Sequence, residues 1–121
     1  MMKRNHDSNN FGGFLYRLRK ESGVGFEEFR QALGVSKAYL NDVETSACRP
    51  PTPEVQIKML KILKSKTDIP AESARIFFDL AAVERGELPA DVVQYLIESG
   101  GALDRVRKTQ EYDLYRKNKG I

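Results

Sequence analysis

Apolar residues recur every three or four positions along most of the chain, a spacing that is typical of helices with one buried face. Glycine, proline and polar residues separate these stretches, and the sequence has no strand-like alternation of apolar and polar residues. We therefore expect an all-α fold. The predicted helices cover residues 10–22, 27–33, 36–45, 53–64, 70–85, 89–99 and 102–117.

Two helix junctions carry clear start and stop signals. Gly34 ends the second predicted helix, because glycine adopts the left-handed backbone angles of a helix end without strain. Ser36 is a natural N-cap for the third helix. The fourth begins at Thr52-Pro53-Glu54, with a capping residue, a proline at the first helical position and an acid near the positive helix end.

The third predicted helix has two unlike faces. Tyr39, Leu40 and Val43 form an apolar face that would pack against a scaffold. Small and polar side chains form the other face: Lys37, Ala38, Asn41, Asp42 and Thr45. A short helix held by one apolar face, with such groups on the other, fits the major groove of DNA. Binding to double-stranded DNA is therefore the leading hypothesis.

A wider set of residues carries a resemblance to a known family. In chain order they are Phe11-Gly12, Leu15, Leu18-Arg19, Gly23-Val24, Glu27-Glu28-Phe29, Leu33-Gly34-Val35-Ser36, Tyr39-Leu40, Val43-Glu44 and Arg49-Pro50-Pro51. With these residues, about residues 10–65 resemble the lambda-repressor-like (XRE-type) helix-turn-helix regulators. The resemblance implies a five-helix DNA-binding bundle, to which this chain adds C-terminal helices. It also implies a dimer that reads an inverted-repeat operator.

The resemblance further implies which side chains face DNA. The third helix would enter the major groove and bring six residues to the bases: Ser36, Lys37, Ala38, Asn41, Asp42 and Thr45. Lys37 can donate to guanine O6 and N7 or to a phosphate, Asn41 can pair bidentately with adenine, and Ala38 can touch a thymine methyl. Asp42 would repel phosphates unless it accepts from cytosine or holds a neighbouring cation.

Basic residues around this helix are candidates for contacts with the phosphate backbone. They are Arg17, Lys20, Arg30, Arg49 and Lys58, with Arg19 as a further candidate. The family counterpart of Arg19 often pairs with the acid that matches Glu44, so the resemblance implies a structural ion pair between these two. Two alternatives stay open for Arg30, which either reaches a phosphate or pairs with Glu27.

The sequence departs from the family pattern at three places. Arg30 stands where a small residue is usual, and Gly25-Phe26 stands where Ser or Thr followed by Gln usually opens the second helix. That glutamine typically touches a phosphate or supports a base contact, which phenylalanine cannot do. A glycine that is common near Ser46 is also missing. The departures concern contacts and packing rather than the fold.

Charge is segregated along the chain, although the net charge is only +3. Residues 1–66 have twelve Lys and Arg against seven Asp and Glu, residues 67–104 have two against eight, and residues 105–121 have six against two. A basic first part suits a polyanion, and the acidic middle is expected to face away from it.

The acidic part also carries more apolar residues than one side of two short helices normally buries. Those predicted to form a homodimer interface are Ile76, Phe77, Leu80, Val92, Val93, Leu96 and Ile97. Burial within one subunit is the alternative. We expect a disordered arm over residues 1–9, a DNA-binding domain over residues 10–66 and a dimerising helical extension over residues 67–121.

These features predict a dimeric, sequence-specific transcriptional regulator, most simply a repressor of bacterial or phage origin. The alternative is an antitoxin-like module that binds a partner protein through residues 67–121. No cofactor, metal site or catalytic residue is expected, because the sequence has one cysteine, one histidine and no nucleophile–base pairing. No apolar run approaches the ~20 residues of a membrane span. We therefore expect a cytoplasmic protein that is nucleoid-associated when bound to DNA.

Overall fold

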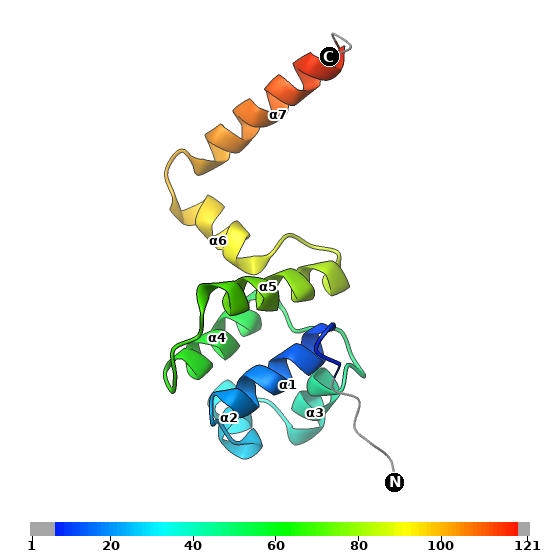
Figure 1. Cartoon of the computed structure of the whole chain (residues 1–121), viewed down its shortest axis with the longest axis vertical. Helices are drawn as coiled ribbons and strands as arrows, with labels where there is room; N and C mark the ends of the chain where they lie inside the picture. Colours follow the sequence, from blue (N-terminus) through cyan, green and yellow to red (C-terminus); the bar gives the residue numbers. More distant parts are fainter. Residues whose placement is uncertain (1–6, 119–121) are drawn as a thin grey trace. The chain divides into compact units, whose positions relative to one another are not determined.

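The computed structural model describes residues 7–118, except the side chains of residues 112 and 114–118, and its regular secondary structure there is helical throughout (Figure 1). The helices are α1 (Phe11–Glu21), α2 (Phe26–Leu33), α3 (Lys37–Glu44), α4 (Pro53–Lys64), α5 (Ala71–Arg85), α6 (Ala90–Glu98) and α7 (Ala102–Asn118). The predicted all-α class is confirmed, and each helix starts and ends within one residue of its expected position. In this part of the chain no helix is both long and apolar enough to cross a membrane.

The chain divides into two compact units, Met1–Ala90 and Asp91–Ile121, and each is described by itself. The first unit contains α1 to α5, which surround one hydrophobic core. This division differs from the expected boundary after residue 66. The reason is that α5 packs into the core of the first unit instead of belonging to a separate extension.

The apolar stripes of five helices meet in the core of the first unit. Its largest fully buried side chains come from every one of them: Phe11, Leu15, Phe29, Leu40, Val43, Met59, Leu63 and Phe77. Removing these side chains from water is the main force that holds the helices together. Because α1 contacts α3 and α5, while α2 contacts α3 and α4, α1 links α5 to the α2–α3 pair.

α5 is anchored to α1 at two points. The Phe77 ring is fully buried and lies 4.9 Å from the Phe11 ring, measured between centroids. The Glu84 carboxylate accepts a hydrogen bond from the Phe11 backbone N–H at 2.6 Å, which satisfies a free donor at the start of α1. The prediction that Phe77 lies in a homodimer interface is therefore wrong, because its side chain is used inside the subunit. Ile76 and Leu80 are partly buried against the same core.

The C-terminal end of α5 is clasped to the loop that follows α3. The Arg85 guanidinium donates to the Pro50 carbonyl at 3.0 Å, and the Arg49 guanidinium donates to the Arg85 carbonyl at 2.9 Å. Gly86 then ends the helix with a φ of 69°, directly after residue 85, where the helix was predicted to end. The two arginine hydrogen bonds link residues that are 35 and 36 positions apart in the sequence, and so they hold the end of α5 against this loop.

The second unit contains α7 and all of α6 except Ala90. Several of its apolar side chains are exposed: Val92, Tyr95, Ile97, Leu103 and Val106. Of the residues predicted for a dimer interface, Val92 is 42% and Ile97 is 78% exposed, and Val93 and Leu96 are partly buried. The Arg105 guanidinium donates to the Tyr95 hydroxyl at 3.2 Å, which ties α7 to α6.

The segment before α1 is partly described. Residues 1–6 of the predicted arm lie outside the described residues. Residues 7–9, which were expected to be disordered, form a turn: the Asp7 carbonyl accepts from the Asn10 N–H at 3.0 Å, and the Asp7 carboxylate accepts from the Asn9 N–H at 2.9 Å. The Asn10 side chain then caps α1 by accepting from the Gly13 N–H at 2.9 Å.

Candidate nucleic-acid interface

α2 and α3 are joined by a short turn that fixes the angle between them. Gly34 has a φ of 75°, and its N–H donates to the Arg30 carbonyl at 2.9 Å. The Val35 N–H donates to the same carbonyl at 3.3 Å, which closes the end of α2. Ser36 then caps α3, because its hydroxyl oxygen accepts from the Tyr39 N–H at 3.0 Å. The predicted helix end at Gly34 and the predicted cap at Ser36 are confirmed.

α3 buries one face and exposes the other. Leu40 and Val43 are buried in the core, so the helix is held from one side. Lys37, Ala38 and Asp42 are exposed, and Asn41 is partly exposed. The open face therefore presents an ammonium group, a methyl group, a carboxamide and a carboxylate on a rigid backbone.

Two hydroxyl groups of this face already have partners within the chain. The Thr45 hydroxyl donates to the Asn41 carbonyl at 2.8 Å, and the Ser36 oxygen accepts the capping bond. Each hydroxyl still has unused hydrogen-bonding capacity: the O–H and one lone pair of Ser36, and the two lone pairs of Thr45. Their first role is nevertheless to shape the two ends of α3.

The buried side of α3 is tied to α1 by an ion pair. The Arg19 guanidinium donates to both carboxylate oxygens of Glu44, from Nε at 2.7 Å and from Nη2 at 2.9 Å, and the two side chains are 5% and 4% exposed. Arg19 Nη1 also donates to the Val24 carbonyl at 3.0 Å. Loss of either partner would leave a buried charge uncompensated, so the pair fixes α3 firmly against α1. The ion pair that the resemblance implies is present.

α1 also approaches the end of α3 closely enough to exclude a side chain. A Cβ atom on Gly12 would lie 2.2 Å from the Val43 carbonyl oxygen, so this position requires glycine. Just beyond α3, Ser46 has a φ of 63°, in the left-handed region that favours glycine. Its hydroxyl donates to the Asn10 side-chain oxygen at 2.9 Å. Serine thus adopts the glycine-like backbone here and adds a hydrogen bond to the start of α1.

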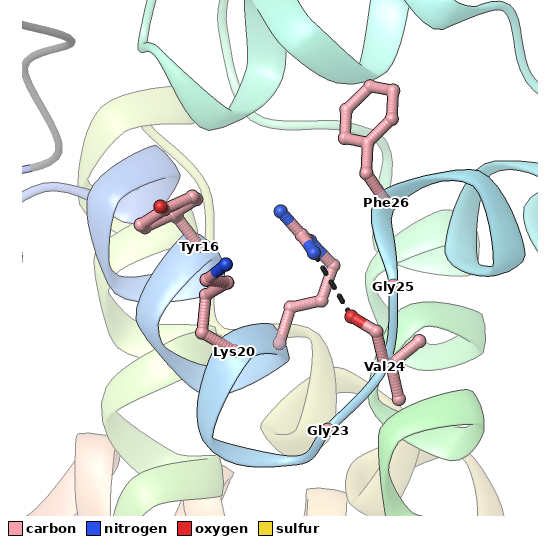
Figure 2. A pocket seen from close by; sticks show the side chains of 7 residues that line it. Tyr16, Lys20, Gly23, Val24, Gly25 and Phe26 are labelled. Atoms are coloured by element: carbon pink, nitrogen blue, oxygen red, sulfur yellow. Dashed lines mark hydrogen bonds between the residues drawn. The ribbon is translucent and has the colours of Figure 1, made fainter.

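A first hollow lies between α1 and the start of α2, with a volume of about 420 Å³. Tyr16 and Lys20 line it from α1, and the loop over residues 23–25 and Phe26 line it from the other side (Figure 2). Lys20 Nζ lies 5.8 Å from the centroid of the Tyr16 ring. The hollow therefore combines an ammonium group, a phenol and backbone near the positive end of a helix, a set of groups that suits an anion.

A second hollow, of about 520 Å³, lies between the start of α2 and the open face of α3. It is lined by Phe26 of α2 and by Lys37, Ala38 and Asn41 of α3. The structure thus brings together three of the six residues predicted to contact bases. Phe26 lines both hollows and separates the anion-suited one from the one at α3.

Comparison with known families decides what kind of domain carries this surface. Residues 10–68 match the family described as "Helix-turn-helix domain". These residues form a helix-turn-helix domain. The match agrees with the lambda-repressor-like resemblance and covers α1 to α4. Searches of curated proteins and of solved structures found no match to the chain.

In the helix-turn-helix domain, the Arg30 side chain forms bonds within the turn between α2 and α3 and to Glu27. Arg30 forms an ion pair with Glu27 through Nη2, and its Nε donates to Glu27 Oε2 at 3.1 Å. Its Nη1 donates to the Val35 carbonyl at 3.0 Å, inside the turn. The hydrogen bond from Arg30 lowers the pKa of Glu27 from its ordinary value of 4.5 to about 2. Of the two alternatives for Arg30, the structure contains the pair with Glu27.

The other predicted phosphate contacts of the helix-turn-helix domain fall into two groups. The first group is engaged within the chain: Lys58 donates from Nζ to the Leu33 carbonyl at 3.3 Å, at the end of α2, and Arg49 donates a hydrogen bond to the Arg85 carbonyl of α5. Arg17 and Lys20 are exposed on α1, and Arg17 Nε lies 3.9 Å from the Glu21 carboxylate. An exposed pair at that distance contributes little, so Arg17 and Lys20 are the more available cations.

Two aromatic residues of the helix-turn-helix domain lie at this surface without having been predicted there. Phe26 was noted in the sequence as a departure from the family pattern, and its ring is partly buried. Tyr16 has no role in the sequence prediction and is partly exposed beside Lys20. A usable signal for Tyr16 is its place directly before a basic stretch that contains Arg17, Arg19 and Lys20. Among residues 7–118, no group of three His, Cys, Asp or Glu side chains is placed to hold a metal ion.

Proposed function

We propose that this protein is a sequence-specific DNA-binding transcriptional regulator, a dimeric repressor that places α3 in the major groove of an inverted-repeat operator. The coarser part of this function, a DNA-binding regulator, follows from the helix-turn-helix domain. The observation that supports sequence-specific reading by α3 is that this helix is held on one side and exposed on the other. The core and the Arg19–Glu44 pair hold one side of the helix, while Lys37 and Ala38 stay exposed on the other.

Base recognition is proposed for the side chains around the second hollow. Lys37 donates to guanine O6 and N7, Asn41 pairs bidentately with adenine, and Ala38 contacts a thymine methyl. Ser36 and Thr45 contribute their remaining hydrogen-bonding capacity at the ends of the helix. Asp42 accepts from a cytosine amino group, because an exposed carboxylate so close to phosphates needs a donor.

Contacts with the phosphate backbone are proposed first for Lys20 and Arg17, whose side chains are exposed on α1. Tyr16 supports the proposal, since it lines the same hollow as Lys20. The positive end of α2 borders the same hollow and attracts a phosphate. Arg30, Arg49 and Lys58 add positive potential from the positions they hold within the first unit. Binding should weaken with salt in proportion to the number of phosphates contacted.

Dimerisation is proposed through the second unit. Val92, Tyr95, Ile97, Leu103 and Val106 are exposed there, and several exposed large apolar side chains in one short region are typical of an interaction surface. A dimer would present two copies of α3 to half-sites about 34 Å apart, one turn of B-DNA. Light scattering after size exclusion, at high micromolar concentration, should give the mass of a dimer. A pure monomer would remove this part of the proposal and favour the alternative, an antitoxin-like module that binds another protein.

Selection of bound sequences from a random pool of double-stranded DNA tests the whole proposal. We expect one preferred motif, arranged as two inverted copies. Recovery of sequences without a common motif would contradict sequence-specific binding. Lys37→Ala combined with Asn41→Ala should then lower the affinity for the motif at least tenfold, since a good base contact contributes roughly 1–3 kcal/mol. Helical content and melting temperature should stay unchanged, and Lys64→Ala, which removes the same charge from α4, is the matched control.

A further inference from the structure

Phe26 occupies the position at the start of α2 where a polar side chain is usual, and its surroundings hold the ring in place. The ring is partly buried and packs against the core of the first unit. The Arg19 guanidinium lies 5.6 Å from the ring centroid, and Arg19 is itself fixed by its buried bonds to Glu44. The exposed edge of Phe26 is therefore a preorganised apolar surface rather than a mobile side chain.

The hollow at α3 has the composition of a surface that reads one edge of a base pair. Phe26 and Ala38 supply apolar surface, while Lys37 supplies a cation and Asn41 supplies a carboxamide. The cation suits the negative potential of DNA, and the carboxamide suits adenine. The one apolar group that a base pair presents in the major groove is the C5-methyl group of thymine.

We propose that Phe26 is a specificity-determining residue, which together with Ala38 contacts the C5-methyl group of a thymine in each half-site. This inference rests on the DNA binding proposed above and goes beyond it, because it assigns base recognition to α2 as well as to α3. Phe26 does not reproduce the polar contact that is usual at this position. It replaces that contact with an apolar one, which selects thymine over the unmethylated cytosine.

A scan of single methyl groups tests the proposal. After the preferred motif has been selected, each thymine of a half-site is replaced in turn by deoxyuridine, which removes the methyl group and keeps base pairing. At one position the affinity of the wild-type protein should fall about fourfold, which corresponds to the roughly 0.8 kcal/mol of one buried methyl group. In the Phe26→Gln variant only Ala38 can still contact the methyl group, so the loss at that position should fall to about twofold or less.

Two controls keep the outcome decisive. Phe26→Leu retains an apolar side chain for the core but lacks the ring edge, so its loss at that position should be about twofold or less. It replaces Phe26→Gln if melting curves show that the glutamine variant does not fold. The proposal is overturned if no deoxyuridine replacement changes the affinity of the wild-type protein. It is also overturned if the replacement lowers the affinity of a Phe26 variant as much as that of the wild type. A wild-type protein that selects no motif contradicts DNA binding itself, so the two failures are distinguishable.

Discussion

The same apolar spacing makes a core in α1 to α5 and an exposed surface in α6 and α7. In the first unit the apolar stripe of each helix faces a common centre, where Phe11, Phe29 and Phe77 are fully buried. Among the described residues of the second unit only Ala102 is buried, while Val92 and Ile97 face solvent. A short helix gains most of its stability from packing its apolar face. The first unit therefore buries most of its large apolar side chains, although Val83 and Leu88 stay exposed, and the second has an apolar surface without a partner in its own unit.

The largest expected effect is at Phe77, which was predicted from the sequence to lie in a dimer interface and which the structure buries in the core of the first unit. Phe77→Ala should lower the free energy of unfolding by about 3–5 kcal/mol, because it removes a buried ring that packs on Phe11 and Phe78. Chemical denaturation followed by circular dichroism measures this change.

Ile97→Ala is the matched control for Phe77→Ala, since Ile97 is 78% exposed. Measured at a concentration low enough to favour monomers, it should change the free energy of unfolding by no more than about 0.5 kcal/mol. If the two substitutions proved equally mild, α5 would not belong to the core, and the contrast between the two units would be lost.

The buried ion pair gives a second way to sharpen the contrast, because it tests charge rather than apolar packing. Glu44→Gln keeps the shape of the side chain but leaves the Arg19 charge without a counterion, at a site where both groups are buried. We expect a loss of about 1.5–3 kcal/mol of stability. Glu21→Gln removes the acid of the exposed pair with Arg17, and it should change stability by about 0.5 kcal/mol or less. Equal losses in the two variants would mean that burial adds nothing to the pair.

The second unit is tested by making its surface polar. Val92→Ser combined with Ile97→Ser removes two exposed apolar side chains. If these residues lie in a dimer interface, the dimer should dissociate at concentrations at least tenfold higher than in the wild type, a change of about 1.4 kcal/mol. Analytical ultracentrifugation measures the dissociation constant, while Phe77 and the rest of the core should be unaffected. An unchanged dimer would place the interface elsewhere.

The contrast also explains which predictions from sequence succeeded. The helix end at Gly34 and the N-cap at Ser36 were predictable, because each depends only on residues a few positions away. The partner of an apolar face is a different matter. Phe77 and Ile97 both lie on apolar stripes, and periodicity shows that each needs covering but not which segment covers it.

At the candidate site, two side-chain positions could not be predicted from the sequence alone. Arg30 can reach Glu27 or a phosphate in any helix with this spacing, and the choice depends on the Val35 carbonyl, which the turn brings within 3.0 Å. Phe26 is apolar enough for the core, yet it begins a helix and so lies at the edge of the core, beside α3. Such edge positions depend on the packing of several segments, and a pattern of apolar residues does not specify them.

The smallest expected effect is at Ser46, an exposed residue just after α3 whose side chain is hydrogen-bonded to the N-cap of α1. Two opposing contributions act there. The left-handed conformation, with a φ of 63°, costs roughly 1 kcal/mol for a residue with a Cβ atom. The hydrogen bond from the hydroxyl to the Asn10 side chain returns about the same amount.

Ser46→Gly removes both contributions, so its free energy of unfolding should lie within about 0.5 kcal/mol of the wild-type value. Ser46→Ala keeps the backbone cost and loses the hydrogen bond, so it should be about 1 kcal/mol less stable than wild type. Thermal denaturation of the three proteins gives the comparison. If glycine and alanine destabilised equally, the hydrogen bond alone would explain the serine. If alanine matched the wild type, the bond would contribute nothing, because Asn10 can satisfy its oxygen with the Gly13 N–H.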